Sequence, residues 1–575
     1  EKLAKDYWRK NLSTYLDWPL PDVTAVELAL DLDPDRSRLK VEGAYDLINN
    51  QEKPLTQVPL TGGLHWESPS WTFEGKDYTP DARSGLYVFT PHEPIPQGGA
   101  FRIGFKFEGT FPQGITKRGG GTNEFILPSG VVLTSFSTSF APRVGFVEGV
   151  GIDDDNRYES KEYPDDHFKG QTEAAFGPRR PFRTKITISG PDRLTYNSVG
   201  ALTNETVENG RRVVVWESDQ PVNFYNVVAG NWEVSRGEGT AVFYHKAHPY
   251  NVAAMVEALD AARTHYSEWF RPYPWKELKL SEFPALASYA QGFPTDVTFS
   301  ESIGFLTDDD PEASAAFTIT AHEAAHQWWG NMIMPGKGPG GNLLSEGTSH
   351  FSTMLLLERA RGPRARMEFS RRIEDTYGKN RSADSERPLV KIDGSRDGDQ
   401  TVTYDKTGWV LWMLMNRMGR ESMLAGIRDF FETYHANVDH PVLQDFLAVL
   451  RTHAKDPDAF DAFTRQWFFE VVAPEFQVTD AVKRREGNAW VVTATVRNVG
   501  GGTVPVEFAA SRGERFVKGK PNENADFKEA RVSITFGPGD SHEVTIPCDF
   551  DPEKFVVDPD VNVLMLRRKA AEAKL

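Results

Sequence analysis

Two histidines and a glutamate stand close together near the middle of the chain, at His322, Glu323 and His326. On a helix with about 3.6 residues per turn, the two histidines lie one turn apart on the same face, so both imidazoles can reach one ion. Glu323 then lies beside that ion without binding it. Neutral imidazole is a good zinc ligand, and a catalytic zinc site has three protein ligands and one open position. The spacing predicts a zinc hydrolase, most often a peptidase.

The third zinc ligand has to come from outside this helix, and Glu346 is the best candidate. It opens an apolar segment that continues through residues 355–357 and is expected to be helical. Residues 335–341 lie between, and their glycines and prolines would break any helix. Two helices joined by this loop would bring Glu346 back to the histidines. The alternative, a chance spacing in a solvated helix, is less favoured because a Glu-Gly pair follows the turn.

Residues 322–331, together with Ser345-Glu346-Gly347, resemble the zinc motif of the aminopeptidase N-like gluzincins. This metallopeptidase family also includes the leukotriene-epoxide hydrolase. The resemblance implies one zinc ion held by His322, His326 and Glu346. It also implies that Glu323 is the general base.

The likeness extends beyond the zinc motif. Residues 404–408 resemble the family's Y-x-K-G segment, whose tyrosine stabilises the transition state, and this implies that role for Tyr404. Trp467 and Pro474 are similar to the end of the family's helical region, and residues 558–560 to its closing strand. A weaker similarity connects the overall pattern to bacterial peptidase segments that follow a transporter-permease membrane region.

One departure from the family concerns the spacing of the third ligand. Nineteen residues separate His326 from Glu346, whereas the family usually has about 18, so Ser345 stands at the expected position. A serine hydroxyl is a poor zinc ligand, and a glycine-rich loop absorbs one extra residue easily. Glu346 therefore remains the predicted ligand.

The second group of departures concerns the residues that hold the substrate's free amine. Residues 298–301 resemble the family's T-Y-R-E segment, and counting back places Gly292 where the amine-anchoring glutamate of the G-x-M-E-N motif belongs. Residues 134–143 replace the segment of the family's second amine-binding acid and contain no acid. Without these carboxylates an ammonium loses its charge-assisted partners. Gln291 and Glu301 are the remaining candidates near the motif, so we expect atypical substrate selection.

His350 follows Glu346 by four residues and shares its face if the segment is helical. Such a histidine can hydrogen-bond a metal ligand and orient it. A helix histidine satisfied by other neighbours is the alternative, and the sequence does not decide between them.

Composition narrows the classes of function. The 575 residues have a formal net charge of −17, which argues against nucleic-acid binding because no basic surface would neutralise phosphates. The single cysteine, Cys548, excludes an intrachain disulfide. No apolar run approaches the roughly 18 residues of a membrane-spanning helix. Since the chain shows neither a signal peptide nor an initiating methionine, we expect a fragment of a larger protein. The similarity to transporter-linked peptidase segments implies that this larger protein is membrane-linked, with an extracytoplasmic or membrane-associated location.

Hydrophobic periodicity divides the chain into three parts. Up to residue 236 apolar and polar residues alternate, which predicts strands; from 237 to 475 the spacing is mostly helical; from 476 to 575 alternation returns between glycine-rich turns. We expect a multidomain α+β protein with an N-terminal all-β domain, an α/β catalytic domain with a helical region, and a C-terminal β-sandwich. The resemblance implies that the middle domain is thermolysin-like. The glycine run 119–121 and the aspartate runs 153–155 and 308–310 are interpreted as turns rather than as phosphate or calcium sites.

The predicted function is zinc-dependent hydrolysis of peptide bonds, with a peptide as the substrate. Two alternatives remain at this point: a hydrolase of a non-peptide substrate, as the epoxide hydrolase illustrates, and a non-catalytic interaction module stabilised by zinc. Glu323 argues against the second, because a structural zinc site has no use for a base.

Overall fold

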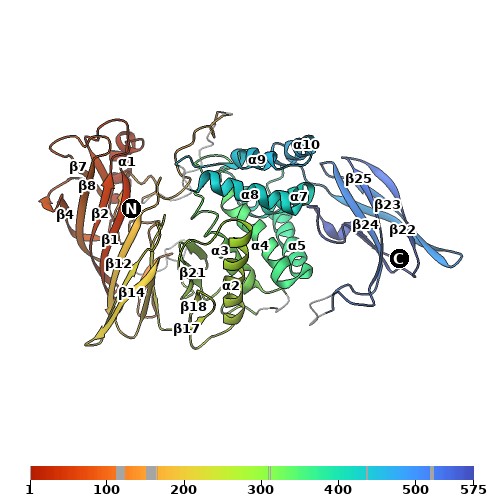
Figure 1. Ribbon diagram of the computed structural model, residues 1–575, viewed down its shortest axis with the longest axis horizontal. Coiled ribbons are helices and arrows are strands. Elements are labelled where there is room, and N and C mark those ends of the chain that lie inside the picture. The colour runs from red at the N-terminus through yellow and green to blue at the C-terminus, as the bar shows by residue number, and fades with distance from the viewer. Residues whose placement is uncertain are drawn as a thin grey trace.

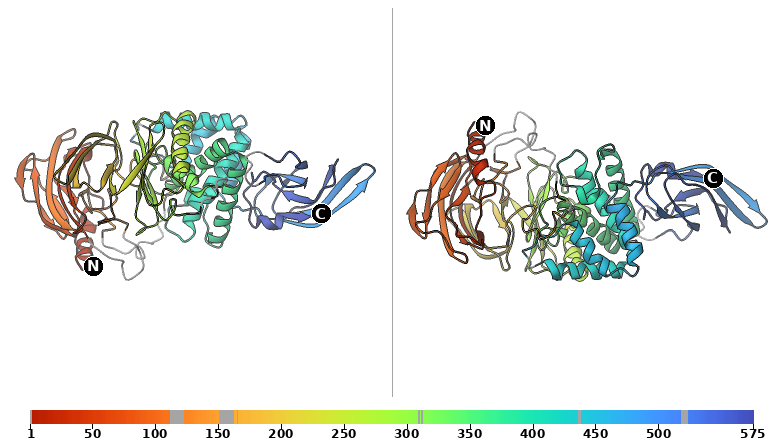
Figure 2. Two further views of the ribbon diagram at one scale, coloured as in Figure 1. Left: turned by 90° about the horizontal axis from the view of Figure 1, so that it is seen from below. Right: turned by 90° about the horizontal axis from the view of Figure 1, so that it is seen from above.

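The computed structural model describes residues 2–111, 123–150, 163–164, 166–308, 310, 313–435, 438–517 and 523–575. The chain forms an elongated molecule with β-sheets at both ends and a helical part in the middle, and the N- and C-terminal domains lie at opposite ends (Figures 1 and 2). The expected multidomain α+β architecture is confirmed. The glycine run 119–121, the aspartate run 153–155 and Asp309 lie outside the described residues.

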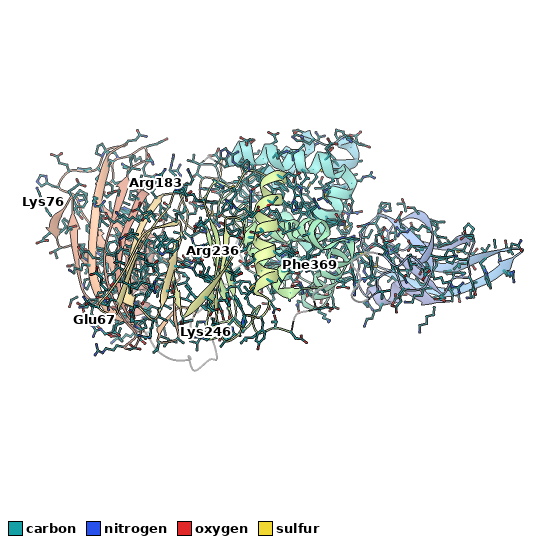
Figure 3. All side chains as sticks on the ribbon, turned by 60° about the horizontal axis from the view of Figure 1, so that its bottom comes forward. Glu67, Lys76, Arg183, Arg236, Lys246 and Phe369 are labelled. Atoms are coloured by element: carbon teal, nitrogen blue, oxygen red, sulfur yellow. The ribbon has the colours of Figure 1, made fainter. Side chains whose placement is uncertain are left out.

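The N-terminal domain is built on an eight-stranded sheet with the order β14-β15-β12-β1-β2-β8-β4-β5. Its central strand β1 (Asp22–Asp33) pairs with β2 (Arg38–Ile48) on one side and runs parallel to β12 (Arg183–Pro191) on the other. The alternating residues Val26 and Leu28 are buried, as the period of two requires. Exposed charged residues such as Glu67 and Lys76 cover the outside of this domain (Figure 3).

Two four-stranded sheets, β13-β16-β10-β9 and β11-β3-β7-β6, complete the N-terminal domain, and helix α1 (Lys2–Tyr15) packs Tyr7 against Leu86 and Val88. The remaining strands are β3 (Val58–Thr61), β4 (Trp66–Phe73), β5 (Lys76–Tyr78), β6 (Asp81–Arg83), β7 (Leu86–Phe89), β8 (Ala100–Thr110), β9 (Phe125–Leu127), β10 (Gly130–Thr134), β11 (Arg143–Val144), β13 (Thr195–Ser198), β14 (Ala201–Glu208), β15 (Arg211–Glu217) and β16 (Asn226–Gly230).

The middle domain begins with a five-stranded sheet of order β17-β18-β19-β21-β20. Strands β18 (Thr240–His245), β19 (Leu278–Phe283) and β21 (Asp296–Ser300) are parallel, so their carboxyl ends meet at one edge. The outer strands β17 (Trp232–Arg236) and β20 (Ala290–Phe293) are antiparallel to their neighbours. β17 belongs to this sheet, although the expected boundary at residue 236 assigns it to the first domain.

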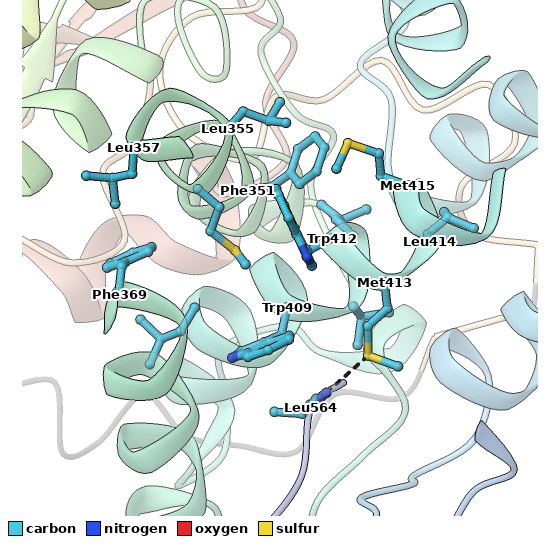
Figure 4. Packing of buried hydrophobic residues seen from close by; sticks show 14 of the residues in the cluster. Phe351, Leu355, Leu357, Phe369, Trp409, Trp412, Met413, Leu414, Met415 and Leu564 are labelled. Carbon is cyan, nitrogen blue, oxygen red and sulfur yellow. Dashed lines mark hydrogen bonds between the residues drawn. The ribbon is translucent and has the colours of Figure 1, made fainter. Parts of the chain in front are cut away.

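Within the described residues, nine α-helices, one π-helical turn and two 3-10 helices follow or cover this sheet. They are α2 (Val252–Trp269), α3 (Ala315–Ala325), a 3-10 helix (Asn342–Leu344), α4 (Glu346–Arg361), α5 (Pro363–Asn380), a second 3-10 helix (Leu389–Lys391), α6 (Asp399–Thr401), the π-helical turn (Val402–Lys406), α7 (Thr407–Met418), α8 (Arg420–Tyr434), α9 (Leu443–Thr452) and α10 (Pro457–Phe468). Helices α4 and α7 pack against each other through large apolar side chains, including Phe351, Trp409 and Trp412 (Figure 4). Each side chain of this size that is removed from water contributes about 1.5–3 kcal/mol, so this packing fixes the position of α4.

The C-terminal domain consists of two sheets, β22-β23-β26 and β25-β24-β27-β28. Its strands are β22 (Phe476–Glu486), β23 (Ala489–Asn498), β24 (Val504–Arg512), β25 (Lys528–Phe536), β26 (Ser541–Cys548), β27 (Lys554–Val557) and β28 (Glu572–Lys574). Phe476, Phe508 and Phe536 form ring contacts in its core. The Leu564 N–H reaches Met413 Sδ of α7 at 3.5 Å and joins this domain to the helices (Figure 4). Among the described residues, no helix combines the length and the apolarity that crossing a membrane requires.

Candidate metal centre and catalytic cleft

Helix α3 carries both histidines of the motif. Ser314 caps its first turn by accepting a hydrogen bond from the Phe317 N–H at 3.0 Å. Ala321, Ala324 and Ala325 are fully buried, and their small side chains let the helix pack closely against its neighbours.

The structure brings His322, His326 and Glu346 into one cluster. Glu346 Oε2 lies 3.3 Å from His322 Nε2 and 3.2 Å from His326 Nε2. Two ligands of a tetrahedral zinc ion with bonds of about 2.0–2.1 Å are about 3.3 Å apart, so these distances fit zinc. The donor set of two imidazoles and one carboxylate also matches a catalytic zinc site.

The charges of this cluster favour a cation among the three side chains. Burial lowers the pKa of His322 to about 3, which keeps its imidazole neutral. Burial also lowers the pKa of His326, but the Glu346 and Glu323 carboxylates outweigh that effect and raise it to about 9. Although burial opposes it, His326 and His322 hold the pKa of the Glu346 carboxyl well below its usual value. The cluster therefore stabilises a positive charge between its donors.

Hydrogen bonds behind His326 orient its ring toward Glu346. The His326 Nδ1–H donates to the Trp329 carbonyl at 3.0 Å, which leaves Nε2 free to face the carboxylate. Ser345, the residue at the family's usual ligand position, lies behind the ring with its Oγ 3.3 Å from Nδ1 and donates to the same carbonyl. Ser349 Oγ lies at the same distance from Nδ1. Ser345 therefore supports the histidine from the side opposite to the metal-facing nitrogen.

His350 supports the other histidine. Its Nδ1 lies 2.9 Å from His322 Nδ1, so one of the two nitrogens donates to the other. His350 Nε2 lies 3.6 Å from Asp405 Oδ1, and Asp405 Oδ2 accepts a hydrogen bond from Thr401 Oγ1 at 2.6 Å. No sequence pattern connects Asp405 and Thr401 with His350, because this contact depends on how α6 and the π-helical turn pack on α4.

Glu323 and Tyr404 border the same cluster. Burial is the main reason that the pKa of the Glu323 carboxyl is raised to about 7, and the Gly292 N–H donates to that carboxylate. The Tyr404 ring lies 6.1 Å from the His322 ring, and burial beside Glu346 raises the pKa of its hydroxyl well above the usual value. Tyr404 thus keeps its proton and can act as a donor. It lies in the π-helical turn, a type of local distortion often found at functional sites.

A cavity of about 850 Å³ opens onto Glu346 and Tyr404. It is also lined by Ser385, Arg396 and Gln400, which come from the segment before the π-helical turn. A cavity of this size can hold several residues of an extended peptide or one compact ligand.

The hairpin of β20 and β21 packs against helix α3, called the zinc helix below, through Gly292 and its neighbours. A Cβ atom at Gly292 would lie 2.6 Å from Glu323 O and 2.8 Å from His326 Cβ, so no larger residue fits at this position without a backbone shift. The Asn331 Nδ2 donates to the Gly292 carbonyl at 2.9 Å, and Gln327 Nε2 donates to the Phe293 carbonyl at 2.8 Å. The sequence offered no sign of these clamping roles.

Gln291 and Glu301, the other two candidates for substrate binding, have different surroundings. Gln291 is half-buried in the edge strand β20. Glu301 accepts a hydrogen bond from the Ala285 N–H at 2.8 Å, and its other oxygen lies 3.2 Å from His248 Nε2. Glu301 therefore belongs to a separate histidine–carboxylate cluster.

Glu124 is a carboxylate near the predicted amine-binding region that sequence analysis missed. It lies on the segment before β10 and accepts hydrogen bonds from Thr134 N and Oγ1 and from Ser139 Oγ through Oε1, and from Ser137 Oγ through Oε2. Three of these bonds converge on Oε1 and one reaches Oε2. Glu124 is therefore committed to holding residues 134–139.

Comparison with known proteins relates the middle of the chain to a peptidase family. The model of the peptidase family M1 domain matches residues 250–467. Aminopeptidase M1-B of Oryza sativa subsp. japonica is 25% identical over 311 residues, which cover 50% of this chain and 34% of that protein. Leucyl aminopeptidase of Saccharolobus solfataricus is 28% identical over 166 residues, 27% of this chain and 21% of that protein. The matched regions thus span about a third or less of these relatives.

Solved structures show the same fold. The M1 zinc metallopeptidase from Deinococcus radiodurans superimposes with a TM-score of 0.55 and 16% identity, over 78% of this chain and 94% of that one. Legionella pneumophila aminopeptidase A, solved in complex with aspartic acid, gives a TM-score of 0.61 and 15% identity, over 96% of this chain and 60% of that one. These findings confirm the resemblance of the zinc motif to that of the aminopeptidase N-like gluzincins, since residues 250–467 match the peptidase family M1 domain and the relatives are M1 aminopeptidases.

Proposed function

We propose that this chain hydrolyses peptide bonds with one zinc ion held by His322, His326 and Glu346. The observation that carries the proposal is the convergence of both Nε2 atoms on Glu346 Oε2 at 3.2–3.3 Å. The match of residues 250–467 to the peptidase family M1 domain and the open cavity beside Glu346 support it further.

A zinc ion bound there supplies Lewis acidity, which activates water and polarises the scissile carbonyl. Glu323 takes a proton from the attacking water while the new carbon–oxygen bond forms. The same carboxyl then gives its proton to the leaving nitrogen as the carbon–nitrogen bond breaks. A carboxyl whose pKa lies near 7 can perform both transfers at neutral pH. Tyr404 donates a hydrogen bond from its hydroxyl to the developing oxyanion. Burial raises the pKa of this hydroxyl, so it stays protonated and suits that role.

The described residues offer no free carboxylate at the positions where the family anchors the substrate's amine. Gly292 offers no side chain and leaves no room for one, because its α-carbon faces the zinc helix. Glu124 already accepts four hydrogen bonds from residues 134–139, and Glu301 is engaged by His248 and the Ala285 N–H. We infer that the cleft accepts blocked or internal peptide bonds as well as free amino termini.

A matched pair of peptides tests this preference. The two share one sequence and one scissile bond, and one of them is N-acetylated; products are identified by mass spectrometry with and without a chelator. A charged hydrogen bond to the substrate amine is worth about 1.5–3 kcal/mol, so an intact anchor would make acetylation cost about 10–150-fold in kcat/KM. We expect a smaller loss than this, and complete inhibition by the chelator.

Two outcomes would contradict the proposal in different ways. A loss above 100-fold on acetylation, abolished in the matched variant Glu124→Gln, would show that an amine anchor exists at Glu124. Zinc-loaded enzyme that cleaves neither peptide would instead favour a non-peptide substrate.

A further inference from the structure

A second group of metal-ligating side chains lies in the same domain, at the carboxyl edge of the parallel strands. His248 follows β18, Glu282 is near the end of β19 and Glu301 follows β21. Because these three strands are parallel neighbours, their carboxyl ends bring the three residues together. One ligand atom from each lies within 4.8 Å of the other two, and none of the three belongs to the His322–His326–Glu346 cluster.

Each carboxylate of this group has one oxygen fixed by the backbone and one that faces the imidazole. Glu282 Oε2 accepts the His245 N–H at 2.5 Å, and Glu301 Oε1 accepts the Ala285 N–H at 2.8 Å. Glu282 Oε1 lies 3.2 Å from His248 Nδ1, and Glu301 Oε2 lies 3.2 Å from His248 Nε2. Backbone hydrogen bonds that hold a carboxylate in this way are typical of metal ligands.

Two of the inward-facing atoms, Glu282 Oε1 and His248 Nδ1, are buried and lack hydrogen bonds. Glu282 is only 2% exposed, and neither its Oε1 nor His248 Nδ1 has a hydrogen-bond partner. Buried polar atoms are nearly always satisfied, so an unpartnered carboxylate oxygen opposite an unpartnered imidazole nitrogen calls for a ligand between them. Their separation of 3.2 Å equals that of the closer pair in the His322–His326–Glu346 cluster.

We propose that His248, Glu282 and Glu301 bind a second divalent cation, separate from the catalytic zinc. One imidazole and two carboxylates suit zinc or manganese. We assign the site a structural role, because Glu301 also accepts a hydrogen bond from the Ala285 N–H. Next to it, Ser300 Oγ donates to the Ala287 carbonyl at 2.6 Å, so the same strand end is bound twice to this segment. Residues 284–289 lead directly into β20, the edge strand that contacts the zinc helix. A cation at this edge therefore stiffens the segment that leads into β20, which packs against α3.

The zinc content of the wild type and of three variants tests the site. It is measured by plasma mass spectrometry after dialysis against zinc and gel filtration. His326→Ala removes the ion of the catalytic cluster and leaves the second group intact. We expect two zinc ions per chain in the wild type, one in His326→Ala and none in His326→Ala/His248→Ala. The matched control is His326→Ala/His453→Ala, which should keep one ion. His453 Nε2 also lies 3.2 Å from a carboxylate, Asp429, but that pair is at the surface.

A second variant covers the case in which His248→Ala unfolds. His326→Ala/Glu282→Gln keeps the size of the side chain and should also lose the remaining zinc, while its circular dichroism spectrum stays native. Zinc should raise the melting temperature of His326→Ala and leave that of His326→Ala/Glu282→Gln unchanged. One ion in the wild type and none in His326→Ala would overturn the proposal, since His248 would then be an imidazolium bridging two carboxylates. An ion that persists without His248 would overturn it equally.

Discussion

Replacing Gly292 by alanine should push strand β20 away from helix α3, which carries His322 and Glu323. The added Cβ would lie 2.6 Å from Glu323 O and 2.8 Å from His326 Cβ. Unstrained contacts of carbon are about 3.5 Å, so the strand or the helix must move by about 0.7–0.9 Å. The neighbouring atoms are a helix carbonyl and a Cβ fixed to the helix backbone, and neither can rotate away.

Two measurable effects follow from this movement. Overpacking of this kind costs about 1–3 kcal/mol, which for a unit of this size lowers the melting temperature by about 2–12 °C. The Gly292 N–H also donates to the Glu323 carboxylate, so the shift displaces the proposed general base. A misplacement of about 1 Å can reduce the rate about 100-fold. Zinc content should remain that of the wild type, because His322, His326 and Glu346 are unchanged.

Scanning calorimetry and the kcat/KM of a fluorogenic peptide measure both effects, and Gly378→Ala is the matched control. Gly378 lies in α5, where the nearest atom to an added Cβ is Leu566 Cδ2 at 3.7 Å. The same substitution there should stabilise the protein by about 0.4–1 kcal/mol and leave activity unchanged. If Gly292→Ala had the melting temperature and the kcat/KM of the wild type, the close contact between β20 and α3 would be refuted.

Three further predictions concern other residues. His350→Ala removes the 2.9 Å contact to His322 Nδ1 and should weaken zinc affinity about 10–100-fold in chelator competition, whereas His453→Ala should not. Tyr404→Phe should lower kcat about 100–1000-fold in steady-state kinetics with little change in KM, because the lost donor acts on the transition state; an unchanged kcat would exclude that role. Cys548 is 4% exposed and burial raises its thiol pKa, so a thiol reagent should label it only after denaturation.

The histidine spacing and the helix breakers between the two ligand helices were enough to predict which residues gather at the metal centre. His322 and His326 share a helix face by geometry alone, and the loop 335–341 must return the chain to Glu346. The alternation of Val26 and Leu28 likewise predicted the strand β1. These features depend on residues close in sequence, where periodicity carries the information.

Features that depend on distant packing were not visible in the sequence. The sequence indicates that Gly292 replaces an amine-binding glutamate. The structure adds that the strand at Gly292 lies too close to α3 for any side chain. Glu301 was a candidate for the substrate, yet its contacts are with His248 and Ala285. Glu124 reaches residues 134–139 through a hairpin, and no local pattern marks it. Each of these depends on which strands become neighbours.

Glu323→Gln tests the central claim most directly, because it keeps the shape of the side chain and removes only its ability to take a proton. The variant is compared with the wild type for zinc content and for the rate of peptide hydrolysis at saturating zinc. We predict an unchanged zinc content and a kcat/KM reduced by at least about 100–10,000-fold, the range that a general base contributes. A variant that cleaves the peptide at the wild-type rate would contradict the assignment of Glu323 and, with it, the proposed mechanism.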